Sequence, residues 1–404
     1  MPGLSGRLTT FNQKNYHGEL LAITPTETPF LTAIGGLSKG GGDTTSREFE
    51  WQYYDLRDAD PARQRLEGAD APTAEARQRA NITNVVEIHH EAIDVSYTAQ
   101  AAREQYAGAN IGGTPNPVTD ELSWQRAREI EQKARDIEVT LLRGVYAKPS
   151  DNATPRKTRG IIEAARNPAG DAGGHPTNIA AAGKAFTVAA STDAVTSNAH
   201  GYADGDGVFL TGTLTGAAGL ALDTVYYVRD STTNTFKLAA TYGGAAIDVT
   251  ADGSGTVQKL TALDEASIVG ALQQTWEDGG IRVQDTAAIM VNGWNKRRLS
   301  KVFVTDKNYQ EQTRTVGGVR VQTIMTDFGE LNVMLNRHVP AHKAVICSLE
   351  QCEPIFLRIP KKGVFFVEEL AKVGASDKEQ LYGEIGLKYG NPYAHHVITG
   401  TTVR

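Results

Sequence analysis

The chain has 404 residues, with 41 lysine and arginine residues against 47 aspartate and glutamate residues and a formal net charge of −6. This acidic balance argues against the strongly basic class of nucleic-acid-binding proteins. A mean hydropathy of −0.34, with no apolar run near the roughly 18 residues of a membrane span, argues against a membrane protein. The length allows two or three domains with real cores.

The two cysteines indicate the redox compartment. Cys347 and Cys352 stand alone at a spacing that is not a zinc-ligand pattern. The N-terminal run also lacks the apolar segment of a secretory signal. We therefore expect two reduced, buried thiols and a cytoplasmic site of synthesis.

The first 43 residues contain little material for a core. One short helix is predicted after Thr28, with Pro29 at its first position and Gly35 ending it. The glycine-rich run at 38–43, SKGGGD, lacks the lysine and hydroxyl residue of a phosphate-binding loop. It is interpreted as a flexible break.

A long β-hairpin is predicted over residues 44–100. Its first strand, REFEWQYY, places Phe49, Trp51 and Tyr53 on one face. The second extended run spans 81–97. Its alternating apolar residues stand at even-numbered positions in the first part and at odd-numbered positions in the second. That change predicts a β-bulge near residues 89–92.

The tip of this hairpin carries charges of both signs. Its arginines are interleaved with acidic residues, Asp58, Asp60, Glu67, Asp70 and Glu75 among them. An isolated two-stranded hairpin is marginal in water, so the tip is either a solvated loop or an intersubunit arm, and we favour the arm. The predicted intersubunit interface residues are Phe49, Trp51, Tyr53, Arg57, Arg63, Arg65, Arg77 and Arg79.

The strongest helical signal runs from Asp120 to Tyr146. Apolar residues recur mostly at steps of three and four, which places them in one stripe. Pro149 limits the continuation. At about 1.5 Å per residue the helix is a rod of roughly 40 Å. An apolar stripe this narrow on a helix this long has to be covered along its length by a sheet or a partner.

Composition changes sharply between Ala181 and Lys259. This segment is rich in alanine, glycine and threonine, and short β signals alternate with Asp-Gly turns. It predicts a small all-β module inserted into another domain. Asp204 and Asp206 suggest calcium, but a full calcium loop is absent, so they are interpreted as turn residues.

The surrounding domain resumes after the insert. It is expected to contain an amphipathic helix, two buried strands, a basic helix or turn, a hairpin and long final strands that return beside the long helix. The amphipathic helix is assigned to residues 264–280, the two buried strands to 287–292 and 343–349, and the basic helix or turn to 293–303. The hairpin is assigned to 318–337 and the final strands to 356–400.

No catalytic, cofactor-binding or metal-binding site is predicted. His89 and His90 are adjacent on a strand and face opposite ways, so a shared metal is not expected. No nucleophile elbow and no dinucleotide glycine motif is present. The basic run at 296–301 is interpreted as a solvated helix face rather than a nucleic-acid contact, because no aromatic stacking platform accompanies it.

Two runs of the sequence resemble a known family. The run at 10–37, TFNQKNYHGELLAITPTETPFLTAIGGL, resembles the opening of a family of tailed-bacteriophage major head proteins. The closing run at 383–400, GEIGLKYGNPYAHHVITG, is similar to the end of such proteins. The resemblance implies an α+β fold, the HK97-like capsid fold, with a small all-β insertion domain.

The resemblance also divides the chain. It implies an N-terminal arm, an extended loop, a peripheral domain with a spine helix, an inserted β domain, an axial domain and a return to the peripheral domain. The N-terminal arm is 1–43, the extended loop 44–100, and the peripheral domain 101–180 with the spine helix at 120–146. The inserted β domain is 181–260, the axial domain 261–354, and the return to the peripheral domain 355–404.

The implied function is that of a major capsid protein, not an enzyme, without cofactors. It self-assembles into the icosahedral head shell of a tailed bacteriophage and encloses the double-stranded DNA genome. Its partners are copies of itself in hexamers and pentamers, DNA packaged without sequence specificity, and scaffold, portal and decoration proteins, with no membrane. It is located in the virion and assembled in the host cytoplasm. The alternative is a phage surface protein that binds a carbohydrate or receptor through the β insert.

Two differences from some relatives matter. Some carry an N-terminal coiled-coil scaffold, which this chain lacks, so a separate scaffold is expected. In others a lysine of the extended loop forms an isopeptide bond with a neighbouring subunit. Residues 44–100 contain no lysine, and an arginine guanidinium stays protonated and cannot replace the amine nucleophile. We therefore expect a shell without covalent cross-links.

Overall fold

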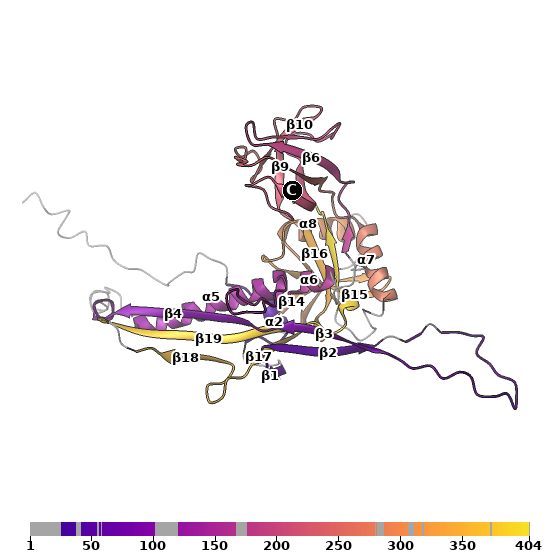
Figure 1. Cartoon of the computed structure of the whole chain (residues 1–404), viewed down its shortest axis with the longest axis horizontal. Helices are drawn as coiled ribbons and strands as arrows, with labels where there is room; N and C mark the ends of the chain where they lie inside the picture. Colours follow the sequence, from indigo (N-terminus) through magenta and orange to yellow (C-terminus); the bar gives the residue numbers. More distant parts are fainter. Residues whose placement is uncertain are drawn as a thin grey trace, which may run out of the picture.

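The computed structural model shows three limbs that meet in one region (Figure 1). A long limb holds β4, β19 and α5, a two-stranded ribbon leaves in the opposite direction, and an upright part carries a small barrel. None of the helices in the described parts of the chain combines the length and apolar character that a membrane crossing requires. The structure describes residues 26–37, 42–54, 56–57, 59–101, 120–166, 176–278, 280, 287–305, 311–316, 319–371 and 374–403.

The long limb is a sheet with a helix laid along it. The sheet has the order β1–β17–β19–β18, and β4 pairs with the other edge of β19. The β4–β19 pairing runs without interruption from Glu87–Ile385 to Ser96–Ser376. The strands are β1 (Gly42–Thr44), β4 (Glu87–Ser96), β17 (Glu353–Leu357), β18 (Phe365–Glu369) and β19 (Ser376–Lys388), and α3 (Tyr97–Ala101) follows β4.

Helix α5 (Glu121–Arg143) confirms the predicted spine helix and ends at Gly144. A Cβ atom at Gly144 would lie 2.4 Å from the carbonyl oxygen of Thr158, so this close approach requires glycine. The C-terminal half of α5 buries Ile137, Leu141 and Leu142 completely. The apolar stripe of the helix is therefore fully buried in its C-terminal half.

The N-terminal half of α5 is held to the sheet by ion pairs. Arg126 donates from Nε to Glu379 on β19 at 2.8 Å, and the second arm of the guanidinium also binds this carboxylate. Lys133 donates to Glu91 on β4 at 2.6 Å. The expectation that the final strands return beside the long helix is thus confirmed.

The second predicted strand of the hairpin divides between two sheets. Strand β2 (Glu48–Tyr54) pairs with β3 (Arg79–Val85), whereas β4 joins the long limb. The predicted bulge at 89–92 is wrong, because the parity changes earlier, where Val85 and Val86 are both buried. Beyond that point His89 takes the inner face with 6% exposure, and Ile88 lies outside with 46%.

The short N-terminal helix α2 (Pro29–Ala33) packs into the body of the subunit. Phe30, Leu31 and Ile34 are buried in the same core as the C-terminal half of α5. The expectation that the first 43 residues hold little core is therefore wrong for α2. The glycine-rich break predicted at 38–43 and the rest of the arm lie largely outside the described residues.

A buried carboxylate on α5 caps this helix. Glu138 accepts hydrogen bonds from the backbone N–H groups of Phe30 at 3.0 Å and Leu31 at 2.6 Å. It also accepts one from the Asn336 side-chain amide at 2.6 Å. Burial raises the pKa of Glu138, and these three donors oppose the rise. Since Thr28 makes no side-chain cap, the long helix supplies the cap instead.

The upright part is built on a sheet with the order β13–β14–β15–β12–β16–β20–β5. Side chains of β12 alternate between two cores. Met290 faces the core shared with α5 and α6, and Ile289 faces a second core under α7 and α8. The sheet is therefore covered by helices on both faces.

The predicted helix and strands of this part are confirmed. The basic run begins as α8 and continues as a π-helical turn, η2; Gly279 lies outside the described residues. The strands are β5 (Pro176–Asn178), β12 (Ala287–Val291), β13 (Glu311–Val316), β14 (Val319–Thr326), β15 (Gly329–Leu335), β16 (Lys343–Ser348) and β20 (His396–Thr399). The helices are α6 (Ile161–Arg166), α7 (Glu265–Glu277), α8 (Gly293–Leu299), η2 (Ser300–Thr305), η3 (Leu349–Gln351) and η4 (Pro392–Ala394).

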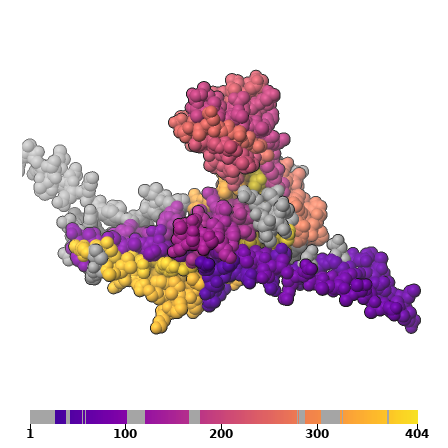
Figure 2. All heavy atoms as spheres, in the orientation of Figure 1, coloured from indigo at the N-terminus to yellow at the C-terminus, as the bar shows by residue number. Residues whose placement is uncertain are grey.

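The inserted segment forms a closed barrel with its own core, as predicted. The strand order is β10–β7–β6–β11–β8–β9, and Phe186, Val208 and Phe236 are buried inside. Figure 2 shows the barrel standing clear of the long limb. Its strands are β6 (Lys184–Ala189), β7 (Ala194–Thr196), β8 (Gly207–Gly216), β9 (Val225–Arg229), β10 (Thr235–Ala239) and β11 (Gly253–Lys259).

The two aspartates noted in the barrel act as turn residues. Asp204 accepts a hydrogen bond from the Ser231 amide at 2.8 Å, and Asp206 pairs with Lys259 at 2.6 Å. Over the described ranges, no group of three or more histidine, cysteine, aspartate or glutamate residues could hold a metal ion.

One aspartate of the barrel ties it to the upright part. Asp223 binds the ring nitrogen Nε2 of His342 at 3.0 Å and the Lys343 ammonium group. The side chains of His342 and Lys343 are only 4% and 3% exposed. Burial alone would raise the pKa of Asp223, but the hydrogen bond from His342 and the charge of Lys343 lower it to about 2.

The Glu138 cap can be tested by substitution. We expect Glu138→Ala to lower the free energy of unfolding by about 1–3 kcal/mol, because it leaves buried N–H donors without an acceptor. Glu138→Gln should cost less, since it keeps one acceptor oxygen. The measurement is urea denaturation of the unassembled subunit. Glu131→Ala on the same helix is the control, because its side chain is 41% exposed. Equal stability of the two alanine variants would contradict the cap.

The Asp223 contact predicts a pH dependence. Its folded pKa of about 2 lies below the unfolded value of about 3.9, so the stabilisation is complete above roughly pH 4 and is lost as pH falls toward 2. With allowance for the half-exposed carboxylate, Asp223→Asn should cost about 1–2 kcal/mol at pH 7. The difference in thermal unfolding from wild type should shrink below pH 4. Asp230→Asn, with a side chain 55% exposed, should show neither effect.

Candidate subunit interface

The β2–β3 ribbon and its tip form a projecting arm. The two strands pair from Glu48–Val85 to Tyr54–Arg79, and the chain between them extends beyond the rest of the molecule (Figure 1). Every described residue from 56 to 81 is exposed, including Leu66 at 86%. The arm therefore has no core of its own beyond the base of the ribbon.

The aromatic side chains at the base contact the same subunit. Trp51 donates from Nε1 to the Gly390 carbonyl at 2.7 Å and meets the Tyr389 ring edge-on at 4.9 Å. Tyr53 also packs against the central core. The ring of Phe49 lies over Gly386, where a Cβ atom would meet it at 2.7 Å. Their predicted common face is confirmed, and a role between subunits stays a prediction.

The charged side chains of the tip converge on one carboxylate. Glu75 accepts hydrogen bonds from Arg63 and, at 3.2 Å, from Arg77. The Nε atom of Arg57 lies 3.8 Å from it. The two hydrogen-bonded arginines lower the pKa of Glu75. Asp60 also lies 3.9 Å from Arg63, so three exposed arginines face two exposed carboxylates and the cluster keeps one net positive charge.

The other two predicted arginines lie outside this cluster. Arg79 binds the Gln52 side chain at 3.2 Å across the ribbon, and Arg65 is exposed in the tip. Sequence reasoning identified the arginines but not their common acceptor. The only available signal was that Glu75 lies between Arg63 and Arg77 in the sequence.

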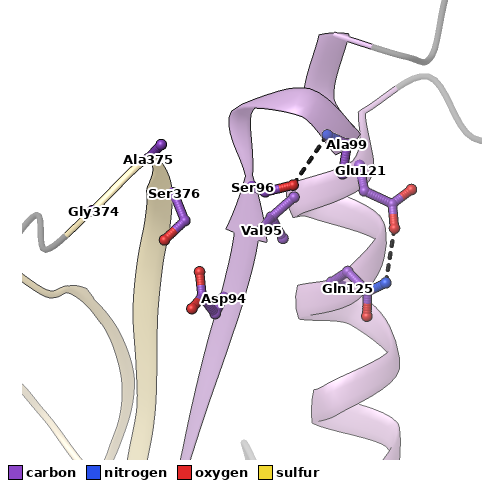
Figure 3. A pocket seen from close by; sticks show the side chains of 9 residues that line it. All are labelled: Asp94, Val95, Ser96, Ala99, Glu121, Gln125, Gly374, Ala375 and Ser376. Atoms are coloured by element: carbon purple, nitrogen blue, oxygen red, sulfur yellow. Dashed lines mark hydrogen bonds between the residues drawn. The ribbon is translucent and has the colours of Figure 1, made fainter.

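A hollow of about 590 Å³ lies at the opposite end of the molecule, where β4, β19 and α5 meet (Figure 3). Its polar groups bind one another. Glu121 accepts from Gln125 at 2.8 Å, and Ser96 accepts from the Ala99 amide at 3.2 Å. Hydrogen bonds from Ser376 and Lys378 lower the pKa of Asp94. We find no acid–base pair set for catalysis among these residues, and the open position suits contact with another molecule.

These features define a class of protein. A spine helix on a long sheet, a projecting ribbon, and a helix-covered sheet bearing an inserted barrel make an α+β fold of the HK97-like capsid type. The model of the SU10 major capsid protein family matches residues 4–402, so the chain belongs to this family. It is a major capsid protein, a structural subunit of a phage head and part of the virion.

Several solved structures are similar to the chain. The chain is similar to the capsid protein of cyanophage A-1(L), with a TM-score of 0.52 and 14% identity over 97% of this chain and 98% of that chain. It is also similar to the capsid protein of cyanophage P-SCSP1u, with a TM-score of 0.49 and 10% identity over 97% and 94%. The SrpI encapsulin of Synechococcus elongatus PCC 7942 gives a TM-score of 0.46 at 10% identity over 98% and 94%.

No curated protein matches the chain. The family that the two sequence runs resembled is confirmed, and so is its role in building the phage head shell. None of the findings favours the alternative, a carbohydrate- or receptor-binding surface protein.

A matched pair of substitutions separates the base of the arm from its tip. Trp51→Ala should lower the free energy of unfolding of the subunit by about 2–4 kcal/mol, because it removes a packed ring and a hydrogen bond. Glu75→Ala should leave that free energy close to the wild-type value while reducing assembly. Denaturation and electron microscopy measure the two effects. A Trp51→Ala subunit as stable as wild type would contradict the packing described.

Proposed function

We propose that this chain tiles an icosahedral head shell as hexamers and pentamers, with the ribbon of each subunit lying on a neighbour. The observation that supports this is the arm itself. Its described tip has no internal core, and holding a chain in one conformation costs about 1–2 kcal/mol per residue. Contacts with a second copy would offset that cost. Large obligate interfaces exceed roughly 2,000 Å², and such an arm supplies exposed surface on two sides.

The parts of the fold then take the following roles. The long limb would be the peripheral domain, predicted as residues 101–180 and 355–404, and it also takes in β4 from the predicted extended loop. The upright part would be the axial domain, predicted as residues 261–354, although its sheet also includes β5 and β20 from outside that range. The barrel, residues 181–260, projects from the axial domain. The extended loop is 44–100, and the arm before it is 1–43. The Asp223 contact supports a fixed barrel orientation, since it would hold the barrel to the two buried side chains of His342 and Lys343.

The tip of the loop holds its neighbour by charge and apolar contact. Arg63 and Arg77, placed by Glu75, would meet carboxylates on the next subunit, and Leu56 and Leu66 are exposed beside them at 63% and 86%. A single exposed ion pair contributes less than about 1 kcal/mol. The strength of the shell would come from repeating such contacts in every copy.

The shell would enclose double-stranded DNA without reading its sequence. A net charge of −6 gives the subunit no general attraction for a polyanion, so the genome would be confined rather than bound tightly. The role is structural, with no catalysis and no cofactor. Assembly would take place in the host cytoplasm, guided by a separate scaffold and completed with portal and decoration proteins.

The test of this function is particle formation. Expression of the chain, alone and with its scaffold, should give closed particles or capsomer rings in electron micrographs. The variant Arg63→Glu/Arg77→Glu should give far fewer, with the subunit still folded by circular dichroism. A wild-type chain that remains monomeric under both conditions would contradict the proposal.

The absence of lysine from residues 44–100 predicts a shell whose subunits are not joined by covalent bonds. Mature particles boiled in detergent should run as one band near the 43.4 kDa monomer. A ladder of multimers that survives a reducing agent would show a cross-link. The donor to substitute first would then be Lys39, which lies outside the described residues.

A further inference from the structure

The axial domain carries an exposed tryptophan beside a half-buried phenylalanine that packs against the second core. Trp276, in the last turn of α7, is 55% exposed. The ring of Phe328, from the β14–β15 turn, lies 6.2 Å from it, centroid to centroid. Tryptophan is strongly enriched among residues that dominate binding energy at protein interfaces. Figures 1 and 2 place α7 at the outer edge of the upright part, where another subunit can reach it.

The outer face of α7 has the composition of an interface. Its centre is formed by Ala266, Gly270 and Gln273, all exposed, where a solvent-facing helix usually carries long charged side chains. A Cβ atom at Gly270 would meet nothing within 4 Å. Packing against the described residues therefore does not explain this glycine, a residue that disfavours helix. This face can accept a close neighbour.

The C-terminal end of α7 is negatively charged. Glu277 and Asp278 lie where the helix dipole is already negative, and no lysine or arginine occurs in the last turn. The side chain of Glu277 is placed by a hydrogen bond from Gln273 at 2.8 Å. A negative charge at this end of a helix is unfavourable for Glu277, and a nearby cation would stabilise it.

A complementary surface lies on α8 and the turn after it. Arg297 is exposed, with its guanidinium 5.5 Å above the Trp294 ring, and Lys301 is exposed one turn later. Within one subunit α8 lies near the opposite end of α7, because Arg298 binds the Leu263 carbonyl at 2.8 Å. The length of α7, about 20 Å, thus separates the acidic end from the basic surface.

We propose that the acidic, aromatic end of α7 in one copy docks on the exposed side of α8 in the neighbouring copy, Glu277 meeting Arg297 and Lys301 while Trp276 is covered. The contact joins two different surfaces of one chain, a head-to-tail arrangement that forms a ring when the rotation closes. The inference rests on the proposed shell function and names a contact that would hold the axial domains of a capsomer together.

Cysteine trapping tests the contact. A Glu277→Cys chain and an Arg297→Cys chain are co-expressed, and the purified particles are mildly oxidised. We expect a disulfide-linked dimer of the 43.4 kDa chain from mixed particles and none from either variant alone, since both native cysteines are buried. Asp230→Cys on the barrel, mixed with Arg297→Cys, is the control for unspecific oxidation. Mixed particles that form without the dimer would overturn the contact and leave the shell function intact.

Charge reversal gives a second measurement. Glu277→Lys should lower the yield of particles roughly tenfold by placing like charges together, and adding Arg297→Glu to the same chain should restore it. Circular dichroism confirms that each variant is folded. A Glu277→Lys variant that assembles as well as wild type would refute the docking. Failure of the wild-type chain to assemble would instead refute the proposed function, and this inference with it.

Discussion

One apolar core holds the three limbs together. It is formed where the C-terminal half of α5 passes between the two large sheets, and Leu141 there shares a core with Met290 of the upright part and Leu387 of the long limb. Helix α2 closes the same core with Phe30. Each limb is anchored in this region and extends away from it. The shape of the subunit therefore depends on the burial of a small set of side chains near its centre.

The limbs differ in what holds them beyond that core. The barrel has an independent apolar interior and is tied to the upright part through Asp223. In the outer half of the long limb the ion pairs Arg126–Glu379 and Lys133–Glu91 join α5 to the sheet, beside the buried side chains of Ile93 and Val95. The ribbon loses its apolar support beyond Tyr53. The amount of apolar packing thus decreases from the centre of the subunit to its charged periphery. This is expected of a protein whose outer parts are covered by other copies of the same chain.

The sequence predicted the elements better than their contacts. The long helix, the barrel and the strands after it carry strong periodicity or composition, and the structure contains them. The division between β3 and β4 was missed because Val85 and Val86 read as one extended run, although they turn the chain from one sheet into another. Periodicity reports which face is apolar and does not report which sheet a strand joins.

The candidate interface shows the same limit. Alternation placed Phe49, Trp51 and Tyr53 on one face, but the partner of that face is Tyr389, more than three hundred residues away. The cap that Glu138 gives α2 could not be predicted, because a glutamate on a helix normally faces solvent and the capped N–H groups of Phe30 and Leu31 lie more than one hundred residues upstream. Long-range pairing of polar groups leaves no local pattern.

The ion-paired outer half of the long limb has a mechanical consequence. A closed shell places identical chains at sites of different curvature, so some part of each chain has to bend. Apolar packing resists bending, because displaced side chains leave voids. Each of the two ion pairs has one exposed member, Arg126 at 38% and Glu91 at 48%, which can move at less cost than a packed side chain, and salt partly weakens the pair. The limb is therefore stiff near the central core and easier to bend at its outer end, and the salt concentration would change that stiffness.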